Sequence, residues 1–253
     1  MKMTGQTVLV TGGGSGIGRA LAEAFHGFGN QVIIAGRRRE VLEEVTRANP
    51  GMKAATLDVQ DAAKVEQFAA EIARDYPALS VLINNAGVMK AENLLAQDQA
   101  VVEATITTNL LAPIRLTSAL LPLLRRQAEA TVINVTSGLA YTPLAMAPTY
   151  CATKAAMHSY SESLRWQLRQ TPVEVLELAP PYVQTELMGP GQAADPRAMP
   201  LGEFISEVMS ILTNQPEARE ILVERVRPLR FAAERGAAGY EEFFRQFNGS
   251  MAH

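Results

Sequence analysis

The sequence predicts one α/β domain built on a doubly wound parallel sheet of about seven strands with helices on both faces. Short β-branched and apolar runs alternate with longer amphipathic runs along the whole chain of 253 residues. That alternation is typical of successive right-handed βαβ units, whose strands form a parallel sheet. The first apolar run also leads directly into a cluster of glycines that opens a helical pattern.

Seven runs are expected to form the strands, because each is short and rich in apolar or β-branched residues. They are residues 7–10, 31–35, 53–57, 80–84, 131–135, 173–179 and 221–223. The composition is 47 % hydrophobic, and no low-complexity linker or further internal repeat divides the chain. Residues 1–253 are therefore expected to form a single domain.

The glycine cluster is interpreted as the phosphate-binding turn of a Rossmann-like fold. It joins the first predicted strand to a helical stripe that begins at Ile17. Glycines permit the tight turn, so that backbone N–H groups and the positive helix end can face a pyrophosphate. Because no Gly-Lys-Ser/Thr sequence follows, a nucleoside-triphosphate loop is disfavoured. The candidate cofactor residues here are Gly12, Gly14, Ser15, Gly16, Ile17 and Gly18.

The end of the second predicted strand indicates which dinucleotide binds. An NAD site usually places an acidic residue there for the ribose 2′-hydroxyl, whereas this chain reads Gly36-Arg37-Arg38-Arg39. An arginine can pair with a 2′-phosphate and stack on adenine. NADP(H) is therefore predicted in preference to NAD(H), with Arg37 first and Arg38 second as phosphate ligands. Arg39 is expected to begin the next helix as a solvated residue.

Tyr150 and Lys154 are predicted to form an acid/base pair, because they lie one helical turn apart in a run over 149–170. Lowering a phenol pKa from about 10 to about 7 requires roughly 4 kcal/mol of preferential stabilisation of the phenolate. A positive charge about 4 Å away, at an effective dielectric of about 20, supplies roughly that amount. The same spacing is common in ordinary helices, so the prediction depends on the nucleotide motif.

With these motifs in order, the chain resembles the single-domain form of the short-chain dehydrogenase/reductase family over nearly its whole length. The glycine motif is Thr11-Gly12-x-x-x-Gly16-x-Gly18, and Asn84-Asn85-Ala86-Gly87 follows the fourth predicted strand. The resemblance implies that the catalytic residues are Asn109, Ser137, Tyr150 and Lys154. It implies further cofactor contacts from Asp58, Val59, Asn85, Ala86, Gly87, Tyr150, Lys154, Pro180, Val183 and Thr185. The chain also resembles a subgroup labelled as D-alanine-teichoic-acid-linked reductases, a label of genomic setting and not of substrate.

One position departs from the family pattern. Where the family usually has Pro-Gly after the sixth strand, this chain has Pro180-Pro181. Proline cannot take a positive φ and has no N–H to donate. The nicotinamide end of the cofactor is therefore expected to be held somewhat differently, although Thr185 still occupies the place of the family's carboxamide-binding threonine.

Together the motifs predict an NADPH-dependent carbonyl (ketone) reductase, or a secondary alcohol dehydrogenase in reverse. Hydride is expected to pass between nicotinamide and carbonyl carbon while Tyr150 exchanges the proton. Ser137 is expected to hydrogen-bond the carbonyl oxygen, Lys154 to lower the pKa of Tyr150 and hold the ribose, and Asn109 to position a water. One alternative is a non-catalytic NADP-binding redox sensor, which would have little need of all four polar residues. Another is a sugar-nucleotide-modifying enzyme of the same fold, which usually has a larger C-terminal domain.

The segment 186–201 is expected to be a lid over the substrate, because it combines Gly and Pro with the adaptable residues Met188 and Met199. An apolar ketone or aldehyde is therefore the expected substrate. The candidate substrate contacts are Ser137, Leu139, Tyr141, Met146, Tyr150, Tyr182 and Met188. The C-terminal tail, 228–253, carries an aromatic stripe that is expected to serve the core or an interface.

Composition argues against several other classes. A net charge of −3 with scattered arginines offers no basic stripe for nucleic acid, and the most apolar stretch, 110–124, is too short and interrupted to span a bilayer. The N-terminus runs directly into the first predicted strand, so a cytoplasmic protein is expected. Cys151 is the one cysteine, and His26, His158 and His253 lack metal-ligand spacing, so neither a disulfide nor a metal is expected. Excess apolar surface on the two long helices that carry catalytic residues predicts a homodimer or homotetramer.

Overall fold

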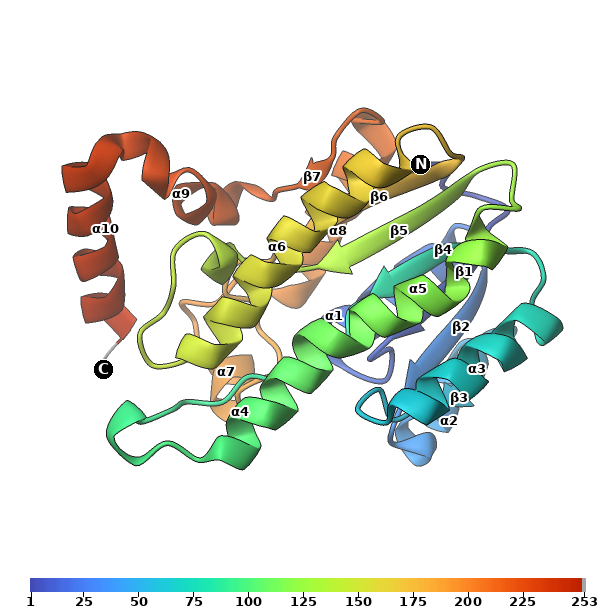
Figure 1. The fold of residues 1–253 in the computed structure, drawn as a ribbon, viewed down its shortest axis with the longest axis horizontal. Coiled ribbons are helices and arrows are strands. Elements are labelled where there is room, and N and C mark those ends of the chain that lie inside the picture. Colours follow the sequence, from blue (N-terminus) through green and yellow to red (C-terminus); the bar gives the residue numbers. More distant parts are fainter. Residues whose placement is uncertain (252–253) are drawn as a thin grey trace.

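The computed structural model describes residues 1–251, and its centre is a parallel sheet with the strand order β3-β2-β1-β4-β5-β6-β7 (Figure 1). This arrangement confirms the predicted fold class. The strands are β1 Thr7–Thr11, β2 Gln31–Gly36, β3 Lys53–Thr56, β4 Leu79–Asn84, β5 Ala130–Val135, β6 Val173–Leu178 and β7 Glu220–Ile221. The strand expected at 221–223 starts one residue earlier and is shorter, because β7 pairs with β6 only opposite Glu177 and Leu178.

Helices cover both faces of the sheet. The front layer in Figure 1 contains α3 (Ala62–Asp75), α5 (Ala112–Leu124) and α6 (Pro148–Leu168), and the other face carries α1 (Gly16–Gly27), α2 (Arg39–Ala48) and α8 (Leu201–Asn214). Successive strand side chains point to opposite faces. In β1, Val8 and Val10 pack on the α1 side and Leu9 packs on the α5 side, and all three are fully buried. Each face of the sheet therefore has its own hydrophobic core.

The order of the strands reverses at β1. The chain adds β2 and β3 on one side of β1, and then returns to add β4 to β7 on the other side. In doubly wound sheets this reversal leaves a crevice beyond the carboxyl ends of the strands, where ligands bind. Thr11 ends β1 and Asn84 ends β4, so the loops that follow both strands enter this crevice.

One segment near the crevice departs from regular α-helix. The helix α4 (Gln99–Ile106) continues into a π-helical turn, Thr107–Leu111, before α5 begins. Such bulges are rare and occur frequently at functional sites. Asn109 lies in this turn. After β5, a 3₁₀ turn at Gly138–Ala140 leads toward α6.

Besides α8 and β7, the described part of the chain after β6 forms four short elements and a longer last helix. They are α7 (Pro190–Ala194), the 3₁₀ turns Glu224–Val226 and Ala232–Arg235 on either side of α9 (Arg227–Arg230), and α10 (Gly236–Met251). In Figure 1, α10 stands beyond the carboxyl ends of β5 and β6, outside both helical layers. Residues 252 and 253, the last two of the expected tail and including His253, lie outside the described residues. Within residues 1–251, no helix combines the length and hydropathy needed to cross a membrane.

Candidate active site

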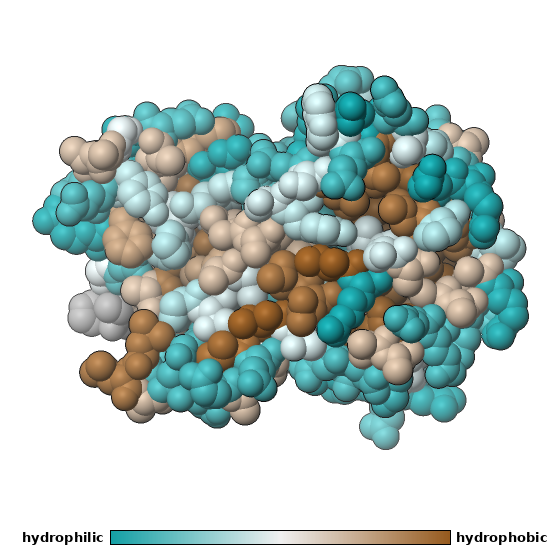
Figure 2. Space-filling model, viewed as in Figure 1, coloured by the Kyte–Doolittle hydropathy of each residue, from teal (hydrophilic) through white to brown (hydrophobic). Residues whose placement is uncertain are grey.

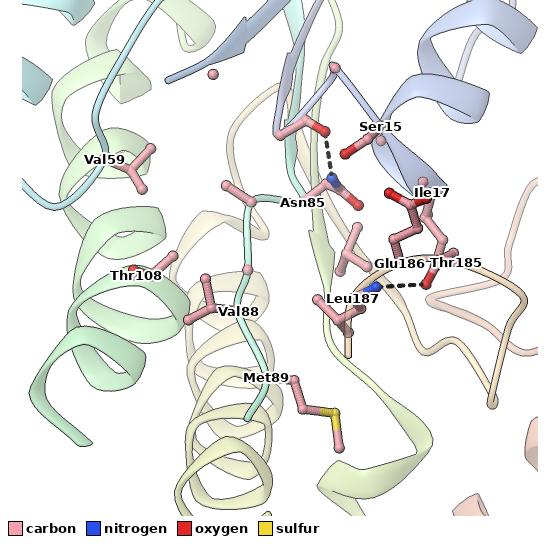
Figure 3. Close-up of a pocket in the computed structure, with 18 of the residues that line it drawn as sticks. Ser15, Ile17, Val59, Asn85, Val88, Met89, Thr108, Thr185, Glu186 and Leu187 are labelled. Carbon is pink, nitrogen blue, oxygen red and sulfur yellow. Dashed lines mark hydrogen bonds between the residues drawn. The ribbon is translucent and has the colours of Figure 1, made fainter. Parts of the chain in front are cut away.

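A cleft of about 450 Å³ follows the carboxyl ends of the strands from β1 to β6. Every residue predicted to contact the cofactor lines this cleft. These residues are Gly12, Gly14, Ser15, Gly16, Ile17, Gly18, Arg37, Arg38, Asp58, Val59, Asn85, Ala86, Gly87, Tyr150, Lys154, Pro180, Val183 and Thr185. In Figure 3, Ser15 and Ile17 lie on one side of the cleft, and Val59 and Thr108 lie on the other.

The glycine turn has the shape of an anion site. Gly12 and Gly16 have positive φ values of 67° and 53°, which residues with a β-carbon rarely adopt. A β-carbon on Gly12 would also lie 2.9 Å from Asn85 Nδ2. Ser15 is the N-cap of α1, but its side chain makes no capping hydrogen bond. The first N–H groups of α1 are therefore available to a pyrophosphate, so the site fits a dinucleotide.

The rim of the cleft beyond β2 is basic. Arg37 follows β2 directly, is exposed, and lines the cleft beside Arg38. The Arg38 guanidinium donates a hydrogen bond to Ser15 Oγ at 3.3 Å, which places it next to the start of α1. Arg39 instead pairs with Glu43 on α2 at 2.7 Å. Two arginines therefore face the cleft, and the third belongs to the helix surface.

The loop after β4 is fixed to β1 by side-chain hydrogen bonds. Thr11 Oγ1 accepts from the N–H of Asn85 at 3.0 Å and from the N–H of Ala86 at 3.1 Å. Asn85 Nδ2 donates back to Thr11 O at 3.0 Å, and Figure 3 shows the Asn85 amide turned toward the glycine turn. These reciprocal bonds hold two walls of the cleft in register.

Asn109 holds the next part of the same loop from behind the cleft. Its Oδ1 accepts from the Val88 N–H and its Nδ2 donates to Val88 O, both at 2.9 Å. Nδ2 also lies 3.3 Å from Thr153 Oγ1 on α6. The π-helical turn thus brings a buried amide between the loop and α6. The role of Asn109 in positioning a water stays a prediction.

Tyr150 and Lys154 lie on α6 beside the end of β5. Both side chains are buried, with exposed fractions of 6 % and 5 %. Lys154 Nζ donates to Val135 O at 2.8 Å and lies 5.6 Å from the centre of the Tyr150 ring. Burial raises the pKa of Tyr150 to about 12, while the Ser137 hydroxyl acts in the opposite direction. Burial also lowers the pKa of Lys154 to about 8, while the charge of Glu177 acts in the opposite direction.

These pKa directions correct one expectation. The spacing of the two residues predicts that the ammonium of Lys154 brings the pKa of Tyr150 toward neutrality. Burial instead dominates both groups and favours the neutral phenol. Burial thus favours the protonated phenol, which is the form that can donate a proton.

A second cavity of about 250 Å³ opens beside Ser137 and Tyr150, and it shares both residues with the cleft. Six of the predicted substrate residues line it, namely Ser137, Leu139, Met146, Tyr150, Tyr182 and Met188. Phe247 and Met251 of α10 also line it, and Phe247 packs against the neighbouring core cluster as predicted for the aromatic stripe of the tail. The walls are therefore mostly apolar, and they come from distant parts of the chain.

Tyr141 is not part of the wall of this cavity, contrary to the prediction. Its hydroxyl lies 2.8 Å from Glu177 Oε1 and 2.9 Å from Glu220 Oε1. The guanidinium of Arg230 lies over its ring, 4.6 Å from the ring centre. The two carboxylates thus hold the side chain away from the cavity. Met199 does not line the cavity either, because it is buried in the core of the sheet.

Glu177 is the centre of a buried ion network. Its carboxylate is 0 % exposed, accepts from Thr136 Oγ1 at 2.7 Å and lies 2.7 Å from His158 Nδ1. The hydrogen bond with Glu177 raises the pKa of His158. Ligand atoms of His158, Glu177 and Glu220 lie within 4.8 Å of one another, a grouping that sequence spacing missed. Arg230 pairs with Glu220 at 2.7 Å, so protein donors already compensate the carboxylates.

Gln192 on α7 is a site residue that the sequence did not indicate. Its Nε2 donates to Val183 O at 2.8 Å and to Thr185 Oγ1 at 3.1 Å, and its Oε1 accepts from the Met188 N–H at 3.0 Å. One buried amide thus fixes Thr185 at the cleft and Met188 at the cavity. No local pattern signals this role, because the residue follows Pro-Gly in a short helix.

Residues 6–195 match the family model described as short chain dehydrogenase. The chain belongs to the short-chain dehydrogenase family. A Bacillus subtilis (strain 168) relative named "Uncharacterized oxidoreductase DltE" is 42 % identical over 253 residues, covering 98 % of each chain. The solved short-chain dehydrogenase from Burkholderia cenocepacia J2315, in complex with NADP, has a TM-score of 0.82 and 24 % identity, covering 96 % of this chain and 99 % of that one. The one from Burkholderia phymatum, in complex with NAD, has a TM-score of 0.80 and 20 % identity, covering 93 % and 95 %.

The two solved structures share the fold of this short-chain dehydrogenase. Because one contains NADP and the other NAD, they do not indicate which of the two this chain prefers. The departure at Pro181 lies where the cleft meets the cavity, and Pro181 lines both. The preceding carbonyl, Pro180 O, accepts from the Gly138 N–H at 2.9 Å. The proline pair is thereby tied to the turn that follows Ser137.

Proposed function

We propose that this short-chain dehydrogenase is an NADPH-dependent carbonyl (ketone) reductase, which in reverse is a secondary alcohol dehydrogenase. The observation that carries the proposal is the meeting of the cleft and the cavity at Ser137 and Tyr150. A dinucleotide that fills the cleft and a carbonyl compound that fills the cavity would meet beside two hydroxyl groups. Positioning of two reactants in this way removes much of the entropic barrier.

The proposed chemistry divides among four side chains. The bound nicotinamide supplies or accepts the hydride. Tyr150 donates the proton from its neutral hydroxyl to the carbonyl oxygen, and Ser137 donates a hydrogen bond to the same oxygen as negative charge develops there. Lys154, oriented by Val135 O, donates to the ribose and carries a positive charge beside the phenol. Asn109 keeps the loop at Val88 in place.

The cavity favours a neutral ketone or aldehyde with apolar groups. Leu139, Met146 and Met188 contribute aliphatic and thioether surface to its walls. Arg197 is a charged residue of the lining, but its guanidinium pairs with Asp195 at 2.9 Å and holds the pKa of that carboxyl down to about 2. The arginine charge is thus compensated within the protein and is not offered to an anionic substrate.

Oxidation of NADPH with a graded panel of neutral ketones and aldehydes tests this proposal. We expect loss of NADPH absorbance with apolar carbonyl compounds, and a large decrease in rate for a Ser137→Ala variant. A nucleotide sugar in the same panel tests the sugar-nucleotide alternative. A protein that binds NADPH but reduces no carbonyl compound would instead be an NADP-binding redox sensor.

An Arg37→Ala variant is expected to bind NADPH about ten- to a hundredfold more weakly while its affinity for NADH stays unchanged. A hydrogen bond to a charged group is worth about 1.5–3 kcal/mol, which corresponds to that range. Arg37 stands at the end of β2, where an NAD site would place an acid. Calorimetric Kd values for both cofactors measure the effect.

Arg39→Ala is the matched control, because Arg39 is also exposed but pairs with Glu43 on α2. Its affinities for NADPH and NADH are expected to equal those of the parent. Equal weakening of both cofactors by Arg37→Ala would show that Arg37 supports the adenine or the loop and does not read the phosphate.

We also propose that the chain forms a homodimer or homotetramer through the face that carries α4 and α5. Figure 2 shows a band of hydrophobic residues across this face. Ile106 ends α4 and Leu111 ends the π-helical turn before α5, and each is 37 % exposed. Contiguous exposed apolar surface commonly marks an interface. Light scattering is expected to give at least twice the mass of one chain, and a monomeric mass would reject the proposal.

A further inference from the structure

We propose that α10 is the outer wall of the substrate cavity. We propose further that the substrates are aryl carbonyl compounds and that Phe247 limits the size of the aryl group. The proposal rests on the proposed reductase function for its turnover readout. The wall itself follows from contacts. Phe247 and Met251 line the cavity and pack against the cluster that contains Met89, Leu144 and Tyr150. The last helix of the chain thus contacts the cluster that holds the proposed proton donor.

Hydrogen bonds join α10 to two segments that line the cavity. Asn248 Oδ1 accepts from the Ala145 N–H at 2.6 Å, and its Nδ2 donates to Pro143 O at 3.2 Å. Arg197, from the segment 186–201, donates to Ser250 O at 3.3 Å. The helix therefore bridges the loop before α6 and the expected lid segment, and it closes the cavity between them.

The remainder of α10 is held weakly. None of its residues is buried, and Figure 1 shows it outside the two helical layers. The helix begins at Gly236, whose φ of 74° lies in the left-handed region. Elements with few buried apolar contacts open at low free-energy cost. Rotation about this glycine would admit a substrate to the cavity, and the Asn248 contacts would then close the wall again.

The chemistry of the wall favours a flat aromatic group. The Phe247 ring is stacked on the Phe243 ring of the same helix, with centres 6.3 Å apart and an angle of 7° between planes. Met89, Met146, Met188 and Met251 surround the cavity. Thioether sulfur and aromatic edges both interact favourably with aromatic rings. An aryl ketone fits these walls better than a charged or strongly hydrated substrate.

Substitution of one phenylalanine at a time tests the wall. In Phe247→Ala the cavity is enlarged, so the ratio of kcat/KM for 2-acetylnaphthalene to that for acetophenone is expected to rise by at least about tenfold. Phe244→Ala is the matched control, because Phe244 stacks on Tyr240 and does not line the cavity. Its ratio is expected to equal that of the parent, and the Kd for NADPH is expected to be unchanged in both variants. Equal ratios in the two variants would overturn the role of Phe247.

Binding without turnover separates this proposal from the reductase proposal. Calorimetry is expected to show that Phe247→Ala weakens acetophenone binding at least about tenfold, while Phe244→Ala does not. That result supports the wall even if no carbonyl compound is reduced. A parent protein that binds neither ketone would overturn the assigned substrate class.

The contacts of Asn248 have a test of their own. Amide hydrogens of α10 are expected to exchange at least about tenfold faster in Asn248→Ala than in the parent, since both hydrogen bonds to the loop before α6 are lost. Gln246→Ala is the control, because Gln246 is exposed on the same helix. Unchanged exchange in Asn248→Ala would show that other contacts hold the helix, and would overturn the proposed closing of the wall by Asn248.

Discussion

Replacement of Tyr150 by phenylalanine is expected to lower kcat at least about a hundredfold while the Kd for NADPH stays within about twofold of the parent value. The change removes the phenol hydroxyl and keeps the ring, which packs with Met89 and Leu144. Because burial raises the pKa of Tyr150 to about 12, the hydroxyl is protonated at neutral pH and is the proposed acid. Single-turnover oxidation of NADPH and calorimetric cofactor binding measure the two quantities separately.

Tyr160→Phe is the matched control for this result. Tyr160 lies on the same helix, and burial raises its pKa as well. It packs against the core that contains α3 and α5, however, and does not line the cavity. Turnover of this variant is expected to equal that of the parent. Near-parent turnover in Tyr150→Phe would show that the proton comes from another group and would remove the catalytic assignment.

The fold and the cofactor cleft could be predicted because local sequence determines them. Val8, Leu9 and Val10 form a run that can satisfy both faces of a parallel sheet, and Gly12 and Gly16 take φ values that other residues avoid. Once the strands are parallel, their carboxyl ends share one edge of the sheet. The loops after six strands must therefore line one cleft, even though their residues are far apart in sequence.

The proposed substrate cavity could be predicted only in part, because its walls depend on long-range contacts. Leu139 and Met146 follow Ser137 closely, so their placement needed little more than the end of β5. Phe247 reaches the same cavity from the last helix, and no local pattern distinguishes it from a packing residue. Tyr141 is oriented by carboxylates on β6 and β7. Pairings of that kind become visible only when the sheet is assembled.

Replacement of Glu177 by glutamine is expected to lower the free energy of unfolding by about 3 kcal/mol, because it removes the charge at the centre of a buried ion network. For a chain of this size, the midpoint of thermal unfolding would fall by roughly 6–12 °C. The substitution weakens the hydrogen bonds that the Glu177 carboxylate accepts from Thr136 and Tyr141 and the one that it makes with His158. Denaturant titration at several pH values measures the change.

The pH dependence of stability separates the contribution of His158. Its pKa is raised first by the hydrogen bond with Glu177, and also by the charges of Glu177, Glu162 and Glu220. A group whose pKa is higher in the folded state stabilises the protein fully below its unfolded pKa of about 6.5. That stability is lost as the pH rises through the folded value. Between the unfolded and the folded pKa of His158, we expect the free energy of unfolding of the parent to fall as the pH rises. For Glu177→Gln we expect a much smaller fall over the same pH range.

Glu162→Gln is the control, because Glu162 faces the same histidine at 3.9 Å from an exposed position. An exposed pair contributes about 0–1 kcal/mol, so this variant is expected to unfold almost as the parent does.

The network also reaches the proposed active site, since the charge of Glu177 raises the pKa of Lys154. Glu177→Gln is therefore expected to lower the pKa of Lys154. In a plot of turnover against pH, the change in rate that is due to Lys154 is expected to move to lower pH. If both variants had the stability and the pH profiles of the parent, the buried carboxylate would neither stabilise the fold nor shift the pKa of Lys154.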